Sequence, residues 1–153
     1  MKKILFSLLF GSCLSATFAQ DAPLRKKEYN LDDGVAISGY DPVAYFTVHK
    51  AVKGSKDNPV VDQGVTYYFA SPADAAEFKK DPAKYEPAYG GWCAYAMGNS
   101  GEKVSVDPKT FKIVEGKLNL FYNKFFSNTL TSWNKDEPNL KKKADSNWAK
   151  IIH

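Results

Sequence analysis

Cysteine, histidine and arginine are scarce in this chain of 153 residues. It contains two cysteines, two histidines and a single arginine, although lysine and arginine together number 21. Bidentate recognition of phosphates and base edges favours arginine, so the positive charge does not indicate a protein that binds nucleic acid. We expect the lysines, such as those of "LKKKAD" at 140–145, to lie on a solvated face.

Long hydrophobic runs are also lacking. The longest apolar stretch, from Ile4 to Phe10, is shorter than the roughly 20 residues that a transmembrane helix needs, so we expect no transmembrane segment. Two lysines precede it and small residues follow up to Ala19, which is the layout of a secretory signal peptide. Residues 1–19 are therefore predicted to be a signal peptide, and the protein to be exported to the periplasm. An alternative interpretation makes Cys13 the lipidated first residue of a lipoprotein.

Loss of the leader would leave Cys93 as the only cysteine, in a compartment where cysteines usually pair. The sequence has no C-x-x-C, no H-E-x-x-H and no phosphate-binding G-x-x-x-x-G-K, which excludes the dithiol, zinc-protease and nucleotide motifs. Three uses of Cys93 stay open: an inert core residue, a soft metal ligand, or a reactive thiol.

Cys93 and Met97 lie four residues apart, so on a helix both sulfurs would project from one side. A thiolate and a thioether are soft donors that suit Cu(I), and His49 could add a third ligand. Gly90 and Gly91 would place Cys93 in the first helical turn, where the helix dipole favours a thiolate. Cysteine and methionine are also common core residues, so simple packing is the alternative.

The remaining pattern predicts one α+β domain at 34–153, with a small antiparallel sheet or hairpins and several packed helices, after a polar, loosely tied arm at 20–33. Hairpins are expected around 62–64 and 115–116. Ser71 and Pro72 favour a helix start, and Pro82 should end that helix. A short helix is predicted at 92–97. The spacing of apolar residues predicts two more helices, one through Phe126, Leu130 and Trp133 and a final one through Leu140, Ala144, Trp148 and Ile151.

Asp41 and several tyrosines are further candidates for a site. Asp41 precedes a proline and is interpreted as a turn former rather than an acid or base. The tyrosines could line a pocket with their hydroxyls, or pack in the core with the hydroxyl bonded at its rim. These are Tyr40, Tyr45, Tyr85, Tyr89 and Tyr95.

Several segments together resemble the YHS-domain family, and in particular its exported single-domain members. They are "GYDPVAYF" (39–46), "YYFASPADAAEFKKDPAKY" (67–85), "YGGWCAYAM" (89–97), "EGKLNLFYN" (115–123) and "ADSNWAKI" (144–151). The resemblance covers nearly the whole chain after the leader. It implies a YHS-like domain with a C-terminal helical extension.

Metal binding is the activity commonly proposed for YHS domains, but the cysteines of their metal-associated pattern are missing here. The corresponding positions hold Ala44, Ala70 and Asp74, and alanine has no donor atom. Asp74 is explained by a capping role at the helix start. The resemblance therefore implies the fold but not the family's metal site.

From the sequence we expect an exported small binding domain that holds a soft metal ion such as copper, or a small ligand, near Cys93. One alternative is a thiol-dependent enzyme or redox protein that uses Cys93. The other is a structural or interaction module with an inert, buried thiol.

Overall fold

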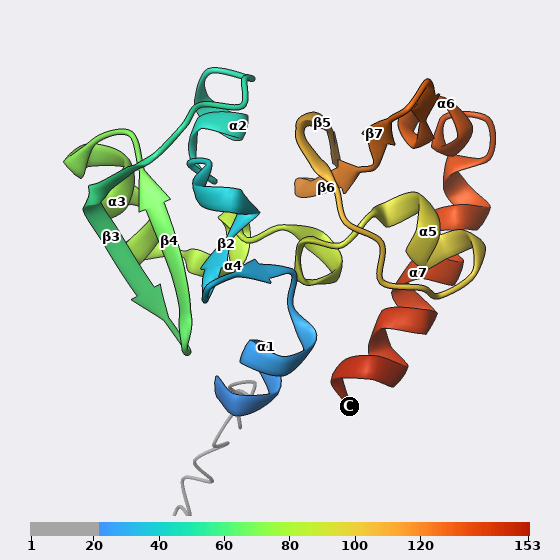
Figure 1. The fold of residues 1–153 in the computed structure, drawn as a ribbon, viewed down its shortest axis with the longest axis horizontal. Coiled ribbons are helices and arrows are strands. Elements are labelled where there is room, and N and C mark those ends of the chain that lie inside the picture. Colours follow the sequence, from blue (N-terminus) through green and yellow to red (C-terminus); the bar gives the residue numbers. More distant parts are fainter. Residues whose placement is uncertain (1–21) are drawn as a thin grey trace, which may run out of the picture.

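The described part of the chain forms two lobes, and the ribbon around residues 82–91 passes from one to the other (Figure 1). The computed structural model describes residues 22–153, so the leader expected at 1–19 and Cys13 lie outside the described residues. Helices and small sheets are mixed along the chain, which confirms the α+β class. Between residues 22 and 153 no helix combines the length and the apolar character needed to span a bilayer.

The first lobe is built on a four-stranded sheet with the strand order β1–β2–β4–β3. Its strands are β1 (Leu31–Asp32), β2 (Val35–Ala36), β3 (Ser55–Asp62) and β4 (Val65–Phe69). The hairpin of β3 and β4 confirms the first predicted hairpin, and its turn residues Gln63 and Gly64 both have positive φ, as a type I′ turn requires. One pairing was not predicted: Val35 and Thr66 bridge in parallel, so the sheet is mixed.

Short helices complete the first lobe. They are α2 (Ala44–Thr47), α3 (Pro72–Lys80) and α4 (Pro82–Tyr85), with the 3-10 turn η1 (Ile37–Gly39). A second 3-10 turn, η2 (Ala88–Gly91), follows α4 and leads into the second lobe. The start of α3 confirms the prediction, because the Asp74 N–H donates to Ser71 Oγ at 3.1 Å and proline occupies the first helical position. The helix ends at Lys80, just before Pro82, as expected.

The second lobe combines two hairpins with three helices. Its elements are α5 (Ala94–Asn99), β5 (Asp107–Val114), β6 (Lys117–Phe121), β7 (Asn123–Lys124), β8 (Ser127–Asn128), α6 (Thr129–Trp133) and α7 (Glu137–Ile152). The hairpin of β5 and β6 turns at Glu115 and Gly116, as predicted. α7 confirms the final helix, and its buried residues include Leu140 and Ala144.

The helix predicted through Phe126 begins later, and that part of the prediction was wrong. Phe126 lies in the turn between β7 and β8, with φ 65°. α6 starts at Thr129 because the Asn128 side chain accepts the Leu130 N–H at 3.0 Å and so caps the helix. Helical spacing alone had included Phe126, but the capping residue decides where the helix starts.

The N-terminal segment packs against the body of the protein. α1 (Ala22–Glu28) contains Arg25, which is 2% exposed and forms an ion pair with Asp62 at 3.3 Å and a second one with Glu86. β1 then joins the sheet. Residues 22–33 are therefore not the loose arm expected from their composition, because the partners of Arg25 come from distant segments that no local pattern reveals.

Two apolar clusters form the core. The first packs against the four-stranded sheet and includes Phe69 and Phe78. The second lies among α5, α6 and α7 and includes Trp133. β6 contributes to both, because Leu120 belongs to the first cluster and Phe121 to the second. Neighbouring residues of a strand point to opposite faces. β6 therefore lies between the two clusters and packs against both.

Candidate functional site

The Cys93 side chain is completely buried. Its Sγ accepts the Tyr122 N–H at 3.4 Å and lies 3.4 Å from Thr129 Oγ1. Cys93 is the N-cap residue of α5 rather than part of its first turn, because α5 covers Ala94–Asn99 and not 92–97. The expected help of the helix dipole is correspondingly weak, since α5 has only six residues and Cys93 stands outside them.

The other two sulfur-site candidates lie in different surroundings. Met97 is also completely buried, within the second apolar cluster beside Trp133 and Leu140. His49 is exposed, in the loop that follows α2, with φ 52°. Among residues 22–153, no group of three or more His, Cys, Asp or Glu side chains is placed to hold a metal ion. The structure thus places Cys93 and Met97 in the core and His49 on the surface.

Asp41 has the structural role expected from the sequence. Its side chain is completely buried and accepts three backbone N–H groups, from Val43 at 2.8 Å, Ala44 at 3.3 Å and Ala70 at 2.8 Å. Burial raises the pKa of this carboxyl, while the three N–H donors act in the opposite direction. Asp41 therefore ties the start of α2 to the end of β4, which explains its position before Pro42.

A cleft between the two lobes brings together side chains that are far apart in the sequence. It has a volume of about 420 Å³. We call it the Tyr29–Trp148 cleft; its principal lining residues are Tyr29, Glu86, Tyr89, Lys117, Asp145 and Trp148. Two other depressions have fewer aromatic walls. One of about 300 Å³ is lined by a single aromatic side chain, and one of about 630 Å³ is lined by none. Aromatic walls with a few fixed polar groups are typical of small-molecule sites.

The segment Tyr89–Gly90–Gly91 shapes the floor of this cleft. All three residues have positive φ, and a Cβ on Gly90 would stand 2.8 Å from the Trp148 ring and 2.9 Å from the Tyr29 ring. Only glycine lets the two rings approach the backbone so closely. Asn30 fixes the segment, because its backbone N–H donates to the Gly90 carbonyl at 2.9 Å.

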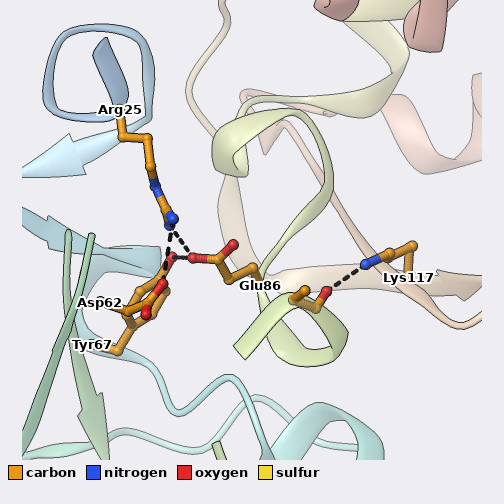
Figure 2. A network of polar contacts seen from close by, with 6 residues as sticks. Arg25, Asp62, Tyr67, Glu86 and Lys117 are labelled. Atoms are coloured by element: carbon orange, nitrogen blue, oxygen red, sulfur yellow. Dashed lines mark hydrogen bonds and ion pairs between the residues drawn. The ribbon is translucent and has the colours of Figure 1, made fainter. Parts of the chain in front are cut away.

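Glu86 is held in a polar network at one wall of the cleft (Figure 2). It forms an ion pair with Arg25 and accepts the Tyr67 hydroxyl at 2.8 Å, while Arg25 also reaches Asp62. Burial, and next the charge of Glu86, raise the pKa of Tyr67, so its hydroxyl stays protonated and donates. On the other side of Glu86 in this view, Lys117 donates to a backbone carbonyl of α4. The network fixes the Glu86 carboxylate before any ligand arrives.

Asp145 on α7 also has side-chain partners, although its side chain is half exposed. Its carboxylate accepts the Tyr89 hydroxyl at 2.9 Å and forms an ion pair with Lys141 at 2.8 Å. Burial also raises the pKa of Tyr29, to about 12, so both cleft tyrosines keep their protons at neutral pH. The cleft thus offers two hydrogen-bonded carboxylates and three aromatic rings.

Of the five tyrosines considered from the sequence, Tyr89 lines the cleft. Tyr45 and Tyr85 are core residues whose hydroxyls donate to the Pro108 carbonyl and to Glu77, each at 2.8 Å. Tyr40 and Tyr95 are half-buried. Sequence reasoning missed Tyr29, Glu86, Asp145 and Trp148 as site residues. The one available signal was the tyrosine followed by two glycines at 89–91, which indicates a close approach of another segment.

A comparison of the chain with protein-family models, with curated proteins and with solved structures finds no match in any of the three.

Proposed function

We propose that this chain is an exported, YHS-like binding module that holds a small organic molecule in the Tyr29–Trp148 cleft. The observation that carries the proposal is the cleft itself, where Trp148 of α7 and Tyr29, which follows α1, lie with carboxylates that already accept hydrogen bonds. Groups that are fixed before binding lower the entropic cost of capturing a ligand.

The YHS-like part of the proposal is supported by where the motif residues lie. Tyr67, Phe69, Phe78 and Tyr85 of the quoted segment 67–85 all belong to the first apolar cluster. Their rings contact one another, with centroids of Phe69 and Phe78 5.1 Å apart. The motif therefore coincides with the core of the lobe rather than with a set of exposed ligands.

The charges of the cleft favour a neutral ligand. Glu86 is paired with Arg25, and Asp145 with Lys141, although each cation also contacts a second carboxylate. Lys117 adds a positive charge to the same walls, so neither sign of charge dominates the cleft. Each carboxylate still has oxygen lone pairs that can accept further hydrogen bonds. A molecule with hydroxyl or amide donors and one apolar face fits these walls, because the apolar face can lie on the ring of Trp148 or Tyr29.

In this proposal Cys93 is a packing residue. A buried thiol among apolar neighbours is inert, and its sulfur already accepts one backbone N–H. The soft-metal hypothesis for Cys93, Met97 and His49 would require two buried core side chains to meet an exposed histidine. The reactive-thiol hypothesis would require a reagent to reach a sulfur with no exposed surface.

The test is a thermal-shift screen of monosaccharides, polyols and small amides, followed by titration calorimetry of each hit. We expect Trp148→Leu to weaken a genuine hit at least tenfold, because it removes the ring on which the ligand lies. Lys143→Gln, which changes the separate basic depression on α7, is the matched control and should leave the affinity unchanged. Unfolding curves of both variants check that the fold is retained.

A different result would favour the metal hypothesis instead. If no compound of the panel binds, and Cu(I) binds the wild type but not Cys93→Ala or Met97→Ala, the cleft proposal is wrong. Equal Cu(I) affinity in all three proteins would remove the copper site and leave the cleft as the site to pursue.

A further inference from the structure

The hairpin of β7 and β8 exposes two aromatic side chains at its tip. Phe125 is 87% exposed and Phe126 is 112% exposed. These are the highest values for any large hydrophobic residue in the described part of the chain. Single exposed apolar residues are common on protein surfaces, but two adjacent phenylalanines at the end of a projecting hairpin form a continuous apolar surface. We call this surface the Phe tip.

The backbone of the Phe tip is unfavourable for phenylalanine. Phe125 has φ 50° and Phe126 has φ 65°, so both central residues of this two-residue turn are left-handed. Such turns favour Asn–Gly or Asp–Gly, because bulky side chains are strained at positive φ. The chain therefore accepts both backbone strain and exposed aromatic surface at one place. Local rules are broken together in this way most often at functional sites.

The hairpin is nevertheless firmly attached to the second lobe. Asn123 Nδ2 donates to Thr110 Oγ1 of β5 at 2.9 Å. At its other end, the Thr129 N–H and hydroxyl both donate to the Tyr122 carbonyl, at 3.0 and 2.9 Å. Figure 1 shows the hairpin beside β5 and α6, on the side of the molecule away from α1. The Phe tip is thus presented on a fixed support.

We propose that the Phe tip inserts into the surface of a lipid bilayer that contains anionic headgroups. The size of the tip favours a bilayer over a folded protein partner. Two phenylalanine side chains offer roughly 300–500 Å², whereas a stable protein interface buries about 800 Å² on each partner. The flanking residues Lys124, Ser127 and Asn128 are polar and exposed, so the apolar area does not extend further along the hairpin.

The charges around the Phe tip fit an anionic surface. Lys124 precedes the two phenylalanines, and Lys109 lies on β5 next to Thr110, the residue that binds the hairpin. Neither ammonium group has an ion-pair partner within residues 22–153. The carboxylate nearest to Lys109 in the sequence is that of Asp107. It accepts the backbone N–H of Lys109 and the Thr110 hydroxyl, and it forms no ion pair with the Lys109 ammonium group. Lysines beside an inserted aromatic residue add the electrostatic half of interfacial binding.

The experiment measures sedimentation of the purified protein with vesicles of phosphatidylcholine, with and without phosphatidylglycerol. We expect the wild type to bind the anionic vesicles more strongly. The double variant Phe125→Asn/Phe126→Gly should reduce binding to both vesicle types by roughly tenfold or more, because it removes the inserted rings. It gives the turn its preferred residues, so loss of folding cannot explain the effect. Lys109→Gln/Lys124→Gln should weaken binding to the anionic vesicles only, by roughly tenfold.

The control is Val48→Ser/Val61→Ser, which removes the two other large exposed apolar residues of the described chain and should leave vesicle binding unchanged. Equal sedimentation of the wild type and Phe125→Asn/Phe126→Gly would overturn the proposal. It would also be overturned if the wild type ignored vesicles but captured, from an extract of its host, a protein that this double variant does not capture, since the Phe tip would then be a protein interface.

Discussion

Gly98 on α5 lies directly against the backbone of Leu140 on α7. A Cβ on Gly98 would stand 2.4 Å from the Leu140 carbonyl oxygen and 3.2 Å from its Cα. These are backbone atoms of a 16-residue helix, so they cannot move aside as a flexible side chain would. The close packing of α5 and α7 therefore depends on the absence of a side chain at position 98.

Gly98→Ala should destabilise the protein although alanine is the better helix former. In a free helix this change would stabilise by up to about 1 kcal/mol, but here we expect the free energy of unfolding to fall by about 2 kcal/mol from overpacking. Urea denaturation measures the difference. Lys142→Ala, on the exposed side of α7, should change it by less than about 0.5 kcal/mol. A gain in stability for Gly98→Ala would contradict the close packing of these helices.

Arg25→Ala should release α1 from the body. The variant leaves the carboxylates of Glu86 and Asp62 without their cation in a partly buried place, so we expect a loss of about 3 kcal/mol in the free energy of unfolding. Lys26→Ala on the same helix is the control, because Lys26 is exposed. Limited proteolysis should cut the Arg25→Ala chain within α1 while the control stays intact.

The pair of Glu28 and Lys103 should make the attachment of α1 sensitive to acid. The hydrogen bond from Lys103 lowers the pKa of Glu28 in the folded state, and Lys27 adds to this effect. A lowered carboxyl pKa stabilises the fold above the ordinary glutamate value of about 4.3, and this contribution is lost as the pH falls through the lowered pKa. Lys103→Gln should therefore be less stable than wild type at pH 7, and the gap should close in acid. A gap that stays constant with pH would contradict this.

The Cys93 thiol should not react while the protein is folded. To leave it as the single thiol, the assay uses Cys13→Ser, followed by a chromogenic disulfide reagent with and without denaturant. We expect reaction only in denaturant, because the Cys93 side chain has no exposed surface. Rapid reaction of the native protein would revive the hypothesis of a functional thiol.

The strain at the Phe tip should be measurable as stability. Phe125→Asn/Phe126→Gly replaces two left-handed phenylalanines with residues that accept positive φ, so we expect the free energy of unfolding to rise by about 1 kcal/mol. Phe125→Ala/Phe126→Ala removes the rings but keeps a Cβ at both positions, so it should show no such gain. An equal gain in both variants would mean that exposure of the rings, rather than the backbone, is unfavourable.

Local signals in the sequence predicted most of the fold. The tight turns at 63–64 and 115–116 and the capped start of α3 were found because each depends on neighbouring residues. The error at Phe126 arose because helical spacing does not show where a helix begins, which the cap at Asn128 decides. The docking of α1 was missed, since the contacts of Arg25 join residues 37 and 61 positions apart.

The site was less predictable than the fold. The rarity of cysteine made Cys93 the candidate from the sequence, but rarity does not distinguish a buried thiol from an exposed one. The Tyr29–Trp148 cleft is lined by Tyr29, which follows α1, and by residues of η2 and α7, and the meeting of these segments depends on tertiary packing. Only the two glycines after Tyr89 hinted at it, through the space they leave.

Because β6 contributes side chains to both apolar clusters, the stability of one lobe depends on the other. Leu118 and Leu120 face one interior and Phe121 faces the other, so loosening either interior withdraws support from the same strand. A break in the chain between the lobes would remove Leu118 and Leu120 from the first core and would leave the same two side chains uncovered in the second half. The molecule thus has two lobes, but we expect it to unfold as one cooperative unit.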